Sequence, residues 1–172
     1  MSNIILIGFM GSGKTTVGIR LSYHMRRTLV DTDKEIEKRR EMEISQIFAQ
    51  KGEAYFRTLE TELLREMIGS EHDKIISTGG GLPIKPENRV LLHRLGTVVY
   101  LKPSPETVYE RIKGDTKRPL LQCADPLTRI RELMAERAGA YADAADVTVD
   151  VDDKSFEEII EEIEKAYETF SN

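Results

Sequence analysis

The sequence contains almost no cysteine and no long apolar segment. Cys123 is the single cysteine in 172 residues. One cysteine excludes an intrachain disulfide and a cysteine-based zinc site, and it suits a reducing cytosol. We interpret Cys123 as an incidental thiol in a loop. No apolar run approaches the roughly 18 residues of a membrane span, and the short run at residues 4–7 lacks the basic flank of a signal peptide. We therefore expect a cytoplasmic protein that does not use a membrane.

The chain also lacks an excess of positive charge. Its formal net charge is −5 at pH 7, which argues against a nucleic-acid partner because phosphate backbones bind basic surfaces. A few arginines that face inward would still hold a small anionic substrate. The length of 172 residues and a composition of 40% hydrophobic and 32% charged residues are typical of one globular domain. We expect a single domain over residues 1–172 and a monomer.

Short apolar runs alternate with helical stretches along the chain. The expected strands are Asn3–Gly8, Thr28–Asp31, Lys74–Ser77, Thr97–Lys102 and Asp146–Asp150. The expected helices lie near Lys14–Arg26, Asp33–Arg40, Ile44–Lys51, Glu53–Gly69, Pro86–Leu95, Ser104–Lys113, Pro126–Ala144 and Ser155–Thr169. This alternation predicts an α/β fold in which a parallel sheet is covered by helices on both faces.

The segment Gly8–Thr15 matches the phosphate-binding loop pattern G-x-x-x-x-G-K-[ST] at every fixed position. It lies between a predicted strand and a predicted helix, so backbone N–H groups and the helix start can surround a polyphosphate. Lys14 is expected to reach the β- and γ-phosphates, and the Thr15 hydroxyl to bind Mg²⁺. A chance glycine turn before a helix is the alternative, and the matching context disfavours it. The residues expected to bind ATP here are Gly11, Ser12, Gly13, Lys14, Thr15 and Thr16.

Two further segments follow predicted strands at the edge where parallel sheets bind ligands. In Asp31-Thr32-Asp33 the two carboxylates point the same way from an extended chain, so one can hold Mg²⁺ while the other accepts a hydroxyl proton. The alternative is that Asp33 only caps a helix beginning at Lys34. Gly79-Gly80-Gly81 would let a ligand approach the backbone closely. Because no acid accompanies these glycines, Asp31 is the better metal candidate.

Three arginines are candidates for binding anions. Arg57 flanks an apolar stripe, and Glu60 is close enough in sequence to form an ion pair with it. Arg137 falls on a helix face that should be buried, so it needs either a structural carboxylate or a bound anion, and the residues alone favour the carboxylate. Arg118 lies in residues 114–125, a loop without clear secondary structure. We interpret this loop as a mobile lid whose arginine reaches the transferring phosphates; a merely flexible connection is the alternative.

Taken together, these elements resemble the shikimate kinase family across essentially the whole chain. The segments that carry the resemblance are Gly8–Thr15, Asp31-Thr32-Asp33, Phe48 with Phe56-Arg57 and Glu60, Gly79-Gly80-Gly81, Arg118-Pro119-Leu120-Leu121 and Met134-Ala135-Glu136-Arg137. The resemblance implies the fold of the nucleoside monophosphate kinases, a three-layer α/β/α P-loop kinase fold with a five-stranded parallel sheet and a closing lid. It also implies that ATP phosphorylates the 3-hydroxyl of shikimate, in the route to chorismate and the aromatic amino acids.

The resemblance implies a role for each segment at the substrate. Asp33 would bind the shikimate hydroxyls and act as the candidate base, and Arg57 and Arg137 would hold the carboxylate. Residues 79–81 would line the same pocket through their backbone N–H groups. Phe48 and Phe56 would form its apolar wall. The helices that bind the substrate would cover about residues 33–69.

The resemblance also implies the nucleotide contacts. Lys14 and Arg118 would neutralise the phosphoryl oxygens, while Thr15 and Asp31 hold Mg²⁺. Arg111 resembles the family residue that lies beside the adenine, although an arginine on a helix surface is usually only solvated. The partners expected are therefore ATP, Mg²⁺ and shikimate.

Two alternatives to phosphorylation of shikimate are open, one within the enzymes and one from a different functional class. Another kinase of this fold, acting on gluconate or on a nucleotide, would share the phosphate loop, but a nucleotide acceptor would demand more positive charge for its phosphate. A regulatory or structural protein that binds a nucleotide and has lost turnover is the second alternative, from a different class. Lys14, Asp33 and Arg118 argue against it, because a mere ATP binder needs neither a base nor a lid arginine.

Overall fold

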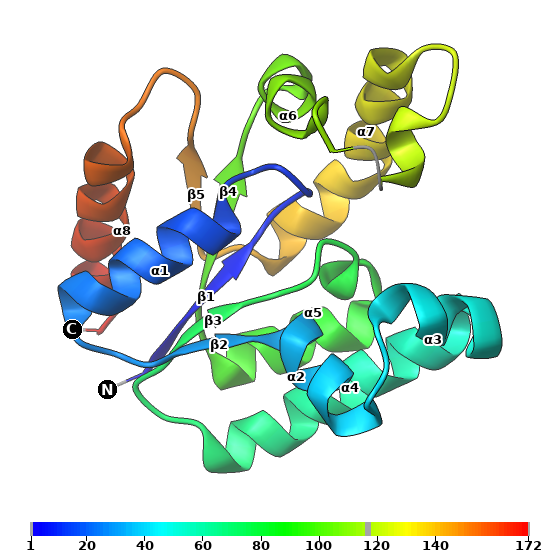
Figure 1. The fold of residues 1–172 in the computed structure, drawn as a ribbon. Coiled ribbons are helices and arrows are strands. Elements are labelled where there is room, and N and C mark those ends of the chain that lie inside the picture. Colours follow the sequence, from blue (N-terminus) through cyan, green and yellow to red (C-terminus); the bar gives the residue numbers. More distant parts are fainter. Residues whose placement is uncertain (1, 116–117, 172) are drawn as a thin grey trace.

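A single five-stranded parallel sheet organises the protein, in the order β2-β3-β1-β4-β5 (Figure 1). The computed structural model describes residues 2–115 and 118–171. The strands are β1 Asn3–Ile7, β2 Leu29–Asp31, β3 Ile75–Ser77, β4 Gly96–Lys102 and β5 Val147–Asp150. Strand β1 pairs with both β3 and β4, so the phosphate-binding loop that follows it starts from the centre of the sheet.

The helices connect these strands and cover both faces of the sheet. They are α1 Lys14–Met25, α2 Thr32–Arg40, α3 Ile44–Lys51, α4 Glu53–Ser70, α5 Pro86–Leu95, α6 Pro105–Ile112, α7 Pro126–Ala144 and α8 Phe156–Ser171. The elements expected from the sequence are all present, and their ends agree within about two residues. Two short 3₁₀ helices were not expected: η1 Leu82–Ile84 after the glycine triplet and η2 Pro119–Leu121 in the proposed lid.

Strand residues alternate between two hydrophobic cores, because successive side chains on a strand point to opposite faces. From β1, Ile4 and Leu6 pack in the core that includes residues of α1 and α8. Ile5 and Ile7 pack in the core that includes residues of α4, α5 and α7. Figure 1 shows α1 and α8 together on one side of the sheet, and α4 and α5 on the other. The architecture is therefore three layers, α/β/α.

The start of α2 differs from the alternative considered for the Asp31-Thr32-Asp33 segment. The helix begins at Thr32, and Asp31 is its N-cap. The Asp31 Oδ1 atom accepts a hydrogen bond from the Lys34 N–H at 3.1 Å. The alternative that Asp33 caps a helix beginning at Lys34 is therefore wrong. Because Asp31 caps the helix, Asp33 lies within its first turn and is available for another role.

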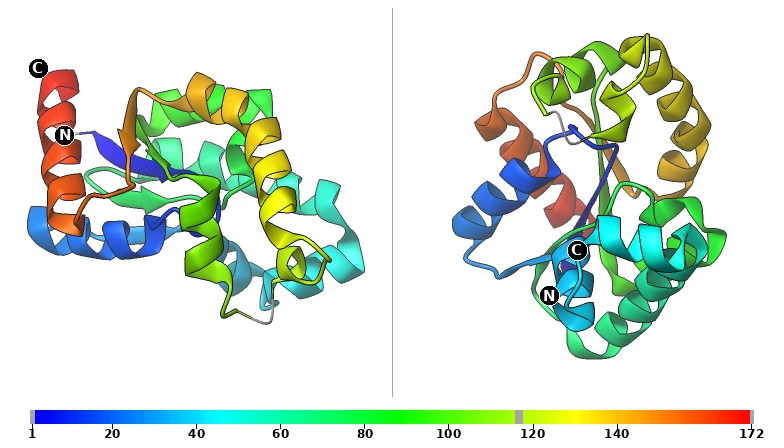
Figure 2. Two further views of the ribbon diagram at one scale, coloured as in Figure 1. Left: turned by 90° about the horizontal axis from the view of Figure 1, so that it is seen from above. Right: turned by 45° about the vertical axis from the view of Figure 1, so that its right-hand side comes forward.

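The loops that carry the predicted site motifs meet at the carboxyl edge of the sheet. In the sheet register, Leu6 of β1 and Asp31 of β2 both lie beside Ser77 of β3. The two termini lie close together in both views of Figure 2, and the Tyr167 hydroxyl donates to the Ser2 carbonyl at 3.0 Å. Since Ser2 precedes β1, the termini are at the amino edge, away from the motif loops. Within the described residues, no helix combines the length and the apolarity needed to cross a membrane.

Candidate active site

The phosphate-binding loop after β1 has the backbone that its glycines permit. Gly8, Gly11 and Gly13 have φ values of 154°, 75° and 99°, in the region that side chains disfavour. A Cβ on Gly8 would lie 2.7 Å from the Leu101 carbonyl oxygen, so a larger residue cannot fit there. The loop ends at Gly13, where α1 begins. Its N–H groups and the start of α1 therefore face the same concave space, which suits a phosphate.

Lys14 is partly buried beside this loop. Its Nζ donates to the carbonyl oxygens of Gly8 at 2.6 Å and Phe9 at 3.1 Å. Burial lowers the pKa of Lys14 to about 8, and the nearby carboxylates of Asp33 and Asp31 oppose that shift. A bound polyphosphate would add negative charge beside the ammonium group and favour its protonated form.

A cavity of about 310 Å³ opens beside the loop. The residues predicted to bind ATP that line it are Gly11, Gly13, Lys14, Thr15, Thr16, Arg111 and Arg118. Ser12 is the exception, because it is buried and its N–H donates to the Phe9 carbonyl at 3.1 Å within the loop. Arg111 reaches the loop from α6 and donates to the Gly11 carbonyl at 3.1 Å. Apart from the buried Ser12, the ATP candidates therefore surround one space.

Asp33 lies between this cavity and a second one. Its carboxylate packs against Gly79, where a Cβ would lie 2.6 Å from Asp33 Oδ1. Oδ1 is buried and has no hydrogen-bond partner among the described residues. Burial, and then the negative charge of Asp31, raise the pKa of Asp33 to about 6, while Lys14 opposes the shift. An acceptor atom left without a donor at this place suits a ligand hydroxyl.

Thr15 and Asp31, the predicted metal ligands, both carry hard oxygen donors. Both line the cavity beside the phosphate-binding loop. The Asp31 Oδ1 atom is occupied by the Lys34 N–H, which leaves the second carboxylate oxygen for a cation. Among residues 2–115 and 118–171, no group of three or more His, Cys, Asp or Glu side chains could hold a metal. This donor set fits Mg²⁺, which usually takes one or two protein oxygens together with phosphate oxygens and waters.

The second cavity has a volume of about 820 Å³ and contains the predicted substrate residues. Those that line it are Asp33, Phe48, Phe56, Arg57, Gly79, Gly80, Gly81 and Arg137. Phe48 of α3 and Phe56 of α4 pack with their ring centroids 5.0 Å apart and form part of its apolar lining. The structure thus gathers side chains from four helices and the backbone of one glycine loop around one space of suitable size for a small ligand.

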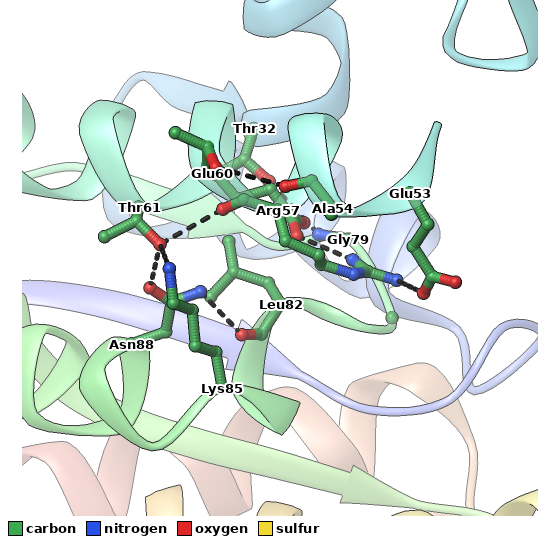
Figure 3. A network of polar contacts seen from close by, with 12 residues as sticks. Thr32, Glu53, Ala54, Arg57, Glu60, Thr61, Gly79, Leu82, Lys85 and Asn88 are labelled. Carbon is green, nitrogen blue, oxygen red and sulfur yellow. Dashed lines mark hydrogen bonds and ion pairs between the residues drawn. The ribbon is translucent and has the colours of Figure 1, made fainter. Parts of the chain in front are cut away.

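Arg57 is held in this cavity by two carboxylates (Figure 3). Its guanidinium donates to Glu60 Oε1 at 2.6 Å and to Glu53 Oε1 at 3.2 Å. The Glu60 side chain is fully buried, and that burial raises its pKa to about 7 although Arg57 favours the charged form. Glu53 is 65% exposed, so its ion pair is weak and a ligand carboxylate can replace it.

Arg137 has a different environment. Its guanidinium carbon lies 5.5 Å from the centroid of the Phe9 ring, and the side chain approaches Gly80. In the part of the chain that the structure describes, no carboxylate forms an ion pair with it. The preference for a structural salt bridge, drawn from the residues alone, is therefore wrong. A cation that faces a cavity without a carboxylate suits an anionic ligand.

Arg118 lines both cavities from the proposed lid. Its Nε pairs with Asp115 at 3.1 Å, and a terminal nitrogen lies 3.6 Å from the Met10 sulfur. The proposed lid at 114–125 includes residues 116–117, which lie outside the described residues. The part that follows contains the 3₁₀ helix η2, so it is not wholly irregular as the sequence had indicated.

Sequence reasoning missed several residues that line the larger cavity. These residues are Met10, Ile44, Ser45, Ala49 and Pro119. Met10 occupies a variable position of the phosphate-loop pattern, and Pro119 belongs to the segment that begins at Arg118 but was given no role of its own. Ile44, Ser45 and Ala49 lie on α3 without any chemical motif, so no sequence signal marked them. Tyr141, one helical turn after Arg137, was not singled out from the sequence. Its hydroxyl donates to the Gly80 carbonyl at 2.6 Å and therefore fixes the glycine triplet.

Comparison with known proteins gives consistent matches. The family model described as shikimate kinase matches residues 10–168. A shikimate kinase of Caldanaerobacter subterraneus is 43% identical over 167 residues, which is 97% of this chain and 96% of the relative. One of Thermodesulfovibrio yellowstonii is 42% identical over 172 residues, which is 100% of this chain and 98% of the relative.

Solved structures agree with these sequence matches. The shikimate kinase of Acinetobacter baumannii in complex with shikimate superposes with a TM-score of 0.90 at 36% identity, covering 98% of this chain and 94% of that one. A gluconokinase of Sinorhizobium meliloti superposes with a TM-score of 0.58 at 16% identity, covering 98% and 93%. At that low identity the second match supports a common fold alone.

Proposed function

This chain belongs to the shikimate kinase family, and from that premise we propose how its residues transfer the terminal phosphoryl group of ATP to the 3-hydroxyl of shikimate. The reaction is a step in the synthesis of chorismate and the aromatic amino acids. The two substrates occupy the two cavities described above, ATP at the phosphate-binding loop and shikimate between Arg57 and Arg137.

One observation carries the proposal: the two cavities share lining residues at their junction. Met10, Asp33, Gly79, Gly80 and Arg118 line both. A phosphate that projects from the loop and a hydroxyl that projects from the larger cavity would therefore meet beside Asp33. Bringing two reactants into such an arrangement supplies much of the rate acceleration in phosphoryl transfer, since the enzyme has little covalent chemistry to perform.

Asp33 and Arg118 act at that junction, and Lys14 acts beside it in the nucleotide cavity. Asp33 accepts a hydrogen bond from the reacting hydroxyl, which gives a donor to its Oδ1 atom, and then takes the proton. Lys14 leaves the loop carbonyls and pairs with phosphate oxygens. Arg118 turns from Asp115 toward the transferring group and stabilises its charge. An arginine in this role is worth roughly 10³–10⁵ in rate.

Arg57 and Arg137 recognise the shikimate carboxylate. Two guanidinium groups offer planar pairs of donors that match a carboxylate. Arg57 is fixed by the buried Glu60, and its weak pair with exposed Glu53 is exchanged for the substrate. Arg137 gains the carboxylate that it lacks in the protein. The backbone N–H groups of Gly79–Gly81 and the rings of Phe48 and Phe56 complete the pocket, with polar and apolar contacts respectively.

Thr15 and Asp31 hold Mg²⁺ in this proposal. When bound there, Mg²⁺ would supply positive charge beside the phosphates. Their placement on the nucleotide cavity, with one Asp31 oxygen committed to the helix cap, supports a site completed by phosphate and water. Arg111, which bonds the loop at Gly11, is proposed to lie beside the adenine.

A coupled assay that measures ADP release with alternative acceptors tests the function. We expect turnover with shikimate and little with gluconate or nucleoside monophosphates at the same concentration. Phosphorus–proton correlation in the NMR spectrum of the product would place the phosphate on the 3-oxygen. Faster turnover with gluconate, or ADP release independent of acceptor, would contradict the proposal.

The remaining parts of the proposal concern organisation. We propose one domain over residues 1–172 with a lid at about 114–125, acting as a cytoplasmic monomer without a nucleic-acid or membrane partner. A net charge of −5 and a single cysteine support this. Light scattering at catalytic concentration measures the mass, and a value of twice the 19.6 kDa chain would contradict the monomer.

A further inference from the structure

A buried polar chain lies behind the substrate cavity, between α4 and α5 (Figure 3). Asn88 of α5 is 0% exposed, and Thr61 of α4 is 3% exposed. The Thr61 hydroxyl lies 2.7 Å from Asn88 Oδ1, and Asn88 Nδ2 lies 2.9 Å from the carbonyl oxygen of Leu82. Neither Thr61 nor Asn88 lines the cavities that hold the proposed substrates, so the function assigned above gives them no role.

The chemistry of the groups sets the direction of this chain. The Leu82 carbonyl only accepts, so it must face the amide N–H₂ of Asn88, and the Asn88 oxygen must face Thr61. The hydroxyl of Thr61 has one proton, which it donates to Asn88. Lys85 Nζ then donates to the Thr61 oxygen at 3.3 Å. The chain therefore satisfies both polar atoms of the Asn88 amide, which a buried amide requires.

The two ends of this hydrogen-bonded chain, Thr61 and Leu82, lie next to the two sides of the substrate pocket. Thr61 lies one helical turn after Arg57, whose carbonyl is 3.1 Å from the Thr61 hydroxyl oxygen. Leu82 directly follows Gly81, and the Arg57 guanidinium packs against Gly81. A change in the spacing between α4 and Leu82 would therefore change the position of Arg57 relative to the glycine triplet.

The glycine triplet is also held at its other residues. The Gly79 N–H donates to the Thr32 hydroxyl at 3.1 Å, and the Gly80 carbonyl accepts from Tyr141. These bonds come from α2 and α7, whereas Asn88 of α5 connects Leu82, which follows the triplet, to Thr61 of α4. Without it, the other polar links between these elements run through the long, partly exposed side chains of Lys85, which reaches Thr61, and of Arg65, which pairs with Glu87. Apolar contacts would remain, but they are not directional.

We propose that Thr61 and Asn88 are a positioning pair, which fixes the distance between the Arg57 guanidinium and the backbone of Gly79–Gly81 so that both engage one shikimate molecule. The inference rests on the proposed function, in which both groups bind shikimate. An apolar pair of the same shape would fill the same volume at little cost in stability. The polar pair therefore contributes to the relative position of the groups that bind shikimate, more than to the stability of the fold.

The test compares Thr61→Val, Asn88→Leu and the double variant with the parent chain. Titration calorimetry gives the affinities for shikimate and for ATP, and thermal denaturation gives Tm. We expect shikimate affinity to fall about 10-fold in each single variant and no further in the double variant, because both changes break the same hydrogen-bonded connection. ATP affinity should stay within about twofold, and Thr61→Ser should restore shikimate affinity because it keeps the hydroxyl.

Two controls separate the possible outcomes. Thr58→Val removes a hydroxyl from the exposed face of the same helix, where it bonds the Ala54 carbonyl at 3.1 Å, and should leave both affinities unchanged. Arg57→Ala tests the proposed site: unchanged shikimate affinity there would overturn the site itself. If Arg57→Ala weakens shikimate binding while the Thr61 and Asn88 variants do not, or weaken ATP binding equally, the positioning pair is overturned. Should Asn88→Leu fail to fold, the Thr61→Val and Thr61→Ser pair still decides.

Discussion

The Asp33 carboxylate lies directly against the backbone of Gly79, with no room between them for a methyl group. A Cβ on Gly79 would be 2.6 Å from Asp33 Oδ1, well inside van der Waals contact. We expect Gly79→Ala to displace the carboxylate and to lower kcat/KM for shikimate by roughly 100-fold, since small displacements at a reacting group are costly. Steady-state kinetics checks this, with ATP affinity as the control. A variant with normal kcat/KM would contradict this, because it would show that the Asp33 carboxylate keeps its catalytic position beside an alanine.

The pH profile of the reaction reports the ionisation of Asp33. Burial and the charge of Asp31 raise the pKa of Asp33 to about 6 in the free enzyme. Only the ionised carboxylate accepts a proton, so kcat/KM for shikimate should rise as pH increases through about 6 and level off above it. Asp33→Asn should lose roughly 10²–10⁴-fold in turnover while keeping ATP affinity. It should also lose the rise near pH 6; an unchanged acidic limb in that variant would assign the ionisation to another group.

The same ionisation makes Asp33 costly to stability at neutral pH. Its folded pKa of about 6 lies above the unfolded value of 3.8. The folded state therefore binds the Asp33 proton more tightly than the unfolded state does. This difference stabilises the folded state fully below pH 3.8, and the stabilisation is lost as pH rises through about 6. We expect Asp33→Asn to raise the free energy of unfolding by about 1–3 kcal/mol at pH 7–8, and Tm by a few degrees. The gain should disappear near pH 4, and a gain that persists there would contradict this origin.

Binding of ATP should take up a proton in alkaline solution. The pKa of Lys14 is lowered to about 8 by burial, so most of the free enzyme carries a neutral lysine at pH 9. The phosphates of MgATP favour the ammonium form and should draw in close to one proton at pH 9, but little at pH 7. Titration calorimetry in buffers of different ionisation enthalpy measures this uptake. Equal uptake at both pH values would exclude Lys14 as its source.

Arg137 provides the sharpest test of carboxylate recognition. It has no carboxylate partner among the described residues, so its removal breaks no ion pair within them. We expect Arg137→Ala to weaken shikimate binding by roughly 10²-fold or more, with ATP affinity intact, as is typical for a desolvated charge pair. Arg137→Lys should recover only part of the loss, because lysine lacks the paired planar donors.

Arg131→Ala is the matched control on the same helix. Arg131 is exposed and pairs with Glu106, so its loss should leave shikimate affinity unchanged. If calorimetry finds the same shikimate affinity for the Arg137 variants and for the parent chain, Arg137 does not belong to the site.

The sequence predicted much of the fold because its signals are local. Strand and helix patterns gave the order of elements, since hydrophobic alternation and capping residues act over a few positions. Gly8–Thr15 was recognisable because one turn of backbone creates the whole phosphate-binding surface. The sequence left open which residue caps α2, because Asp31 and Asp33 are equally suitable. Only the geometry of the first turn shows that Asp31 is the cap.

The sequence by itself therefore determined the α/β class, the phosphate-binding loop and the identity of the groups that bear charge. The Arg57–Glu60 pair lies within one helix and was within reach of the sequence. Tertiary structure alone decided that Arg137 has no carboxylate partner among the described residues, and that Thr61 reaches Asn88 across 27 positions. The physical reason is range. Backbone conformation and helix faces follow from neighbouring residues, whereas the partner of a buried charge or amide depends on which distant helices the packed cores bring together.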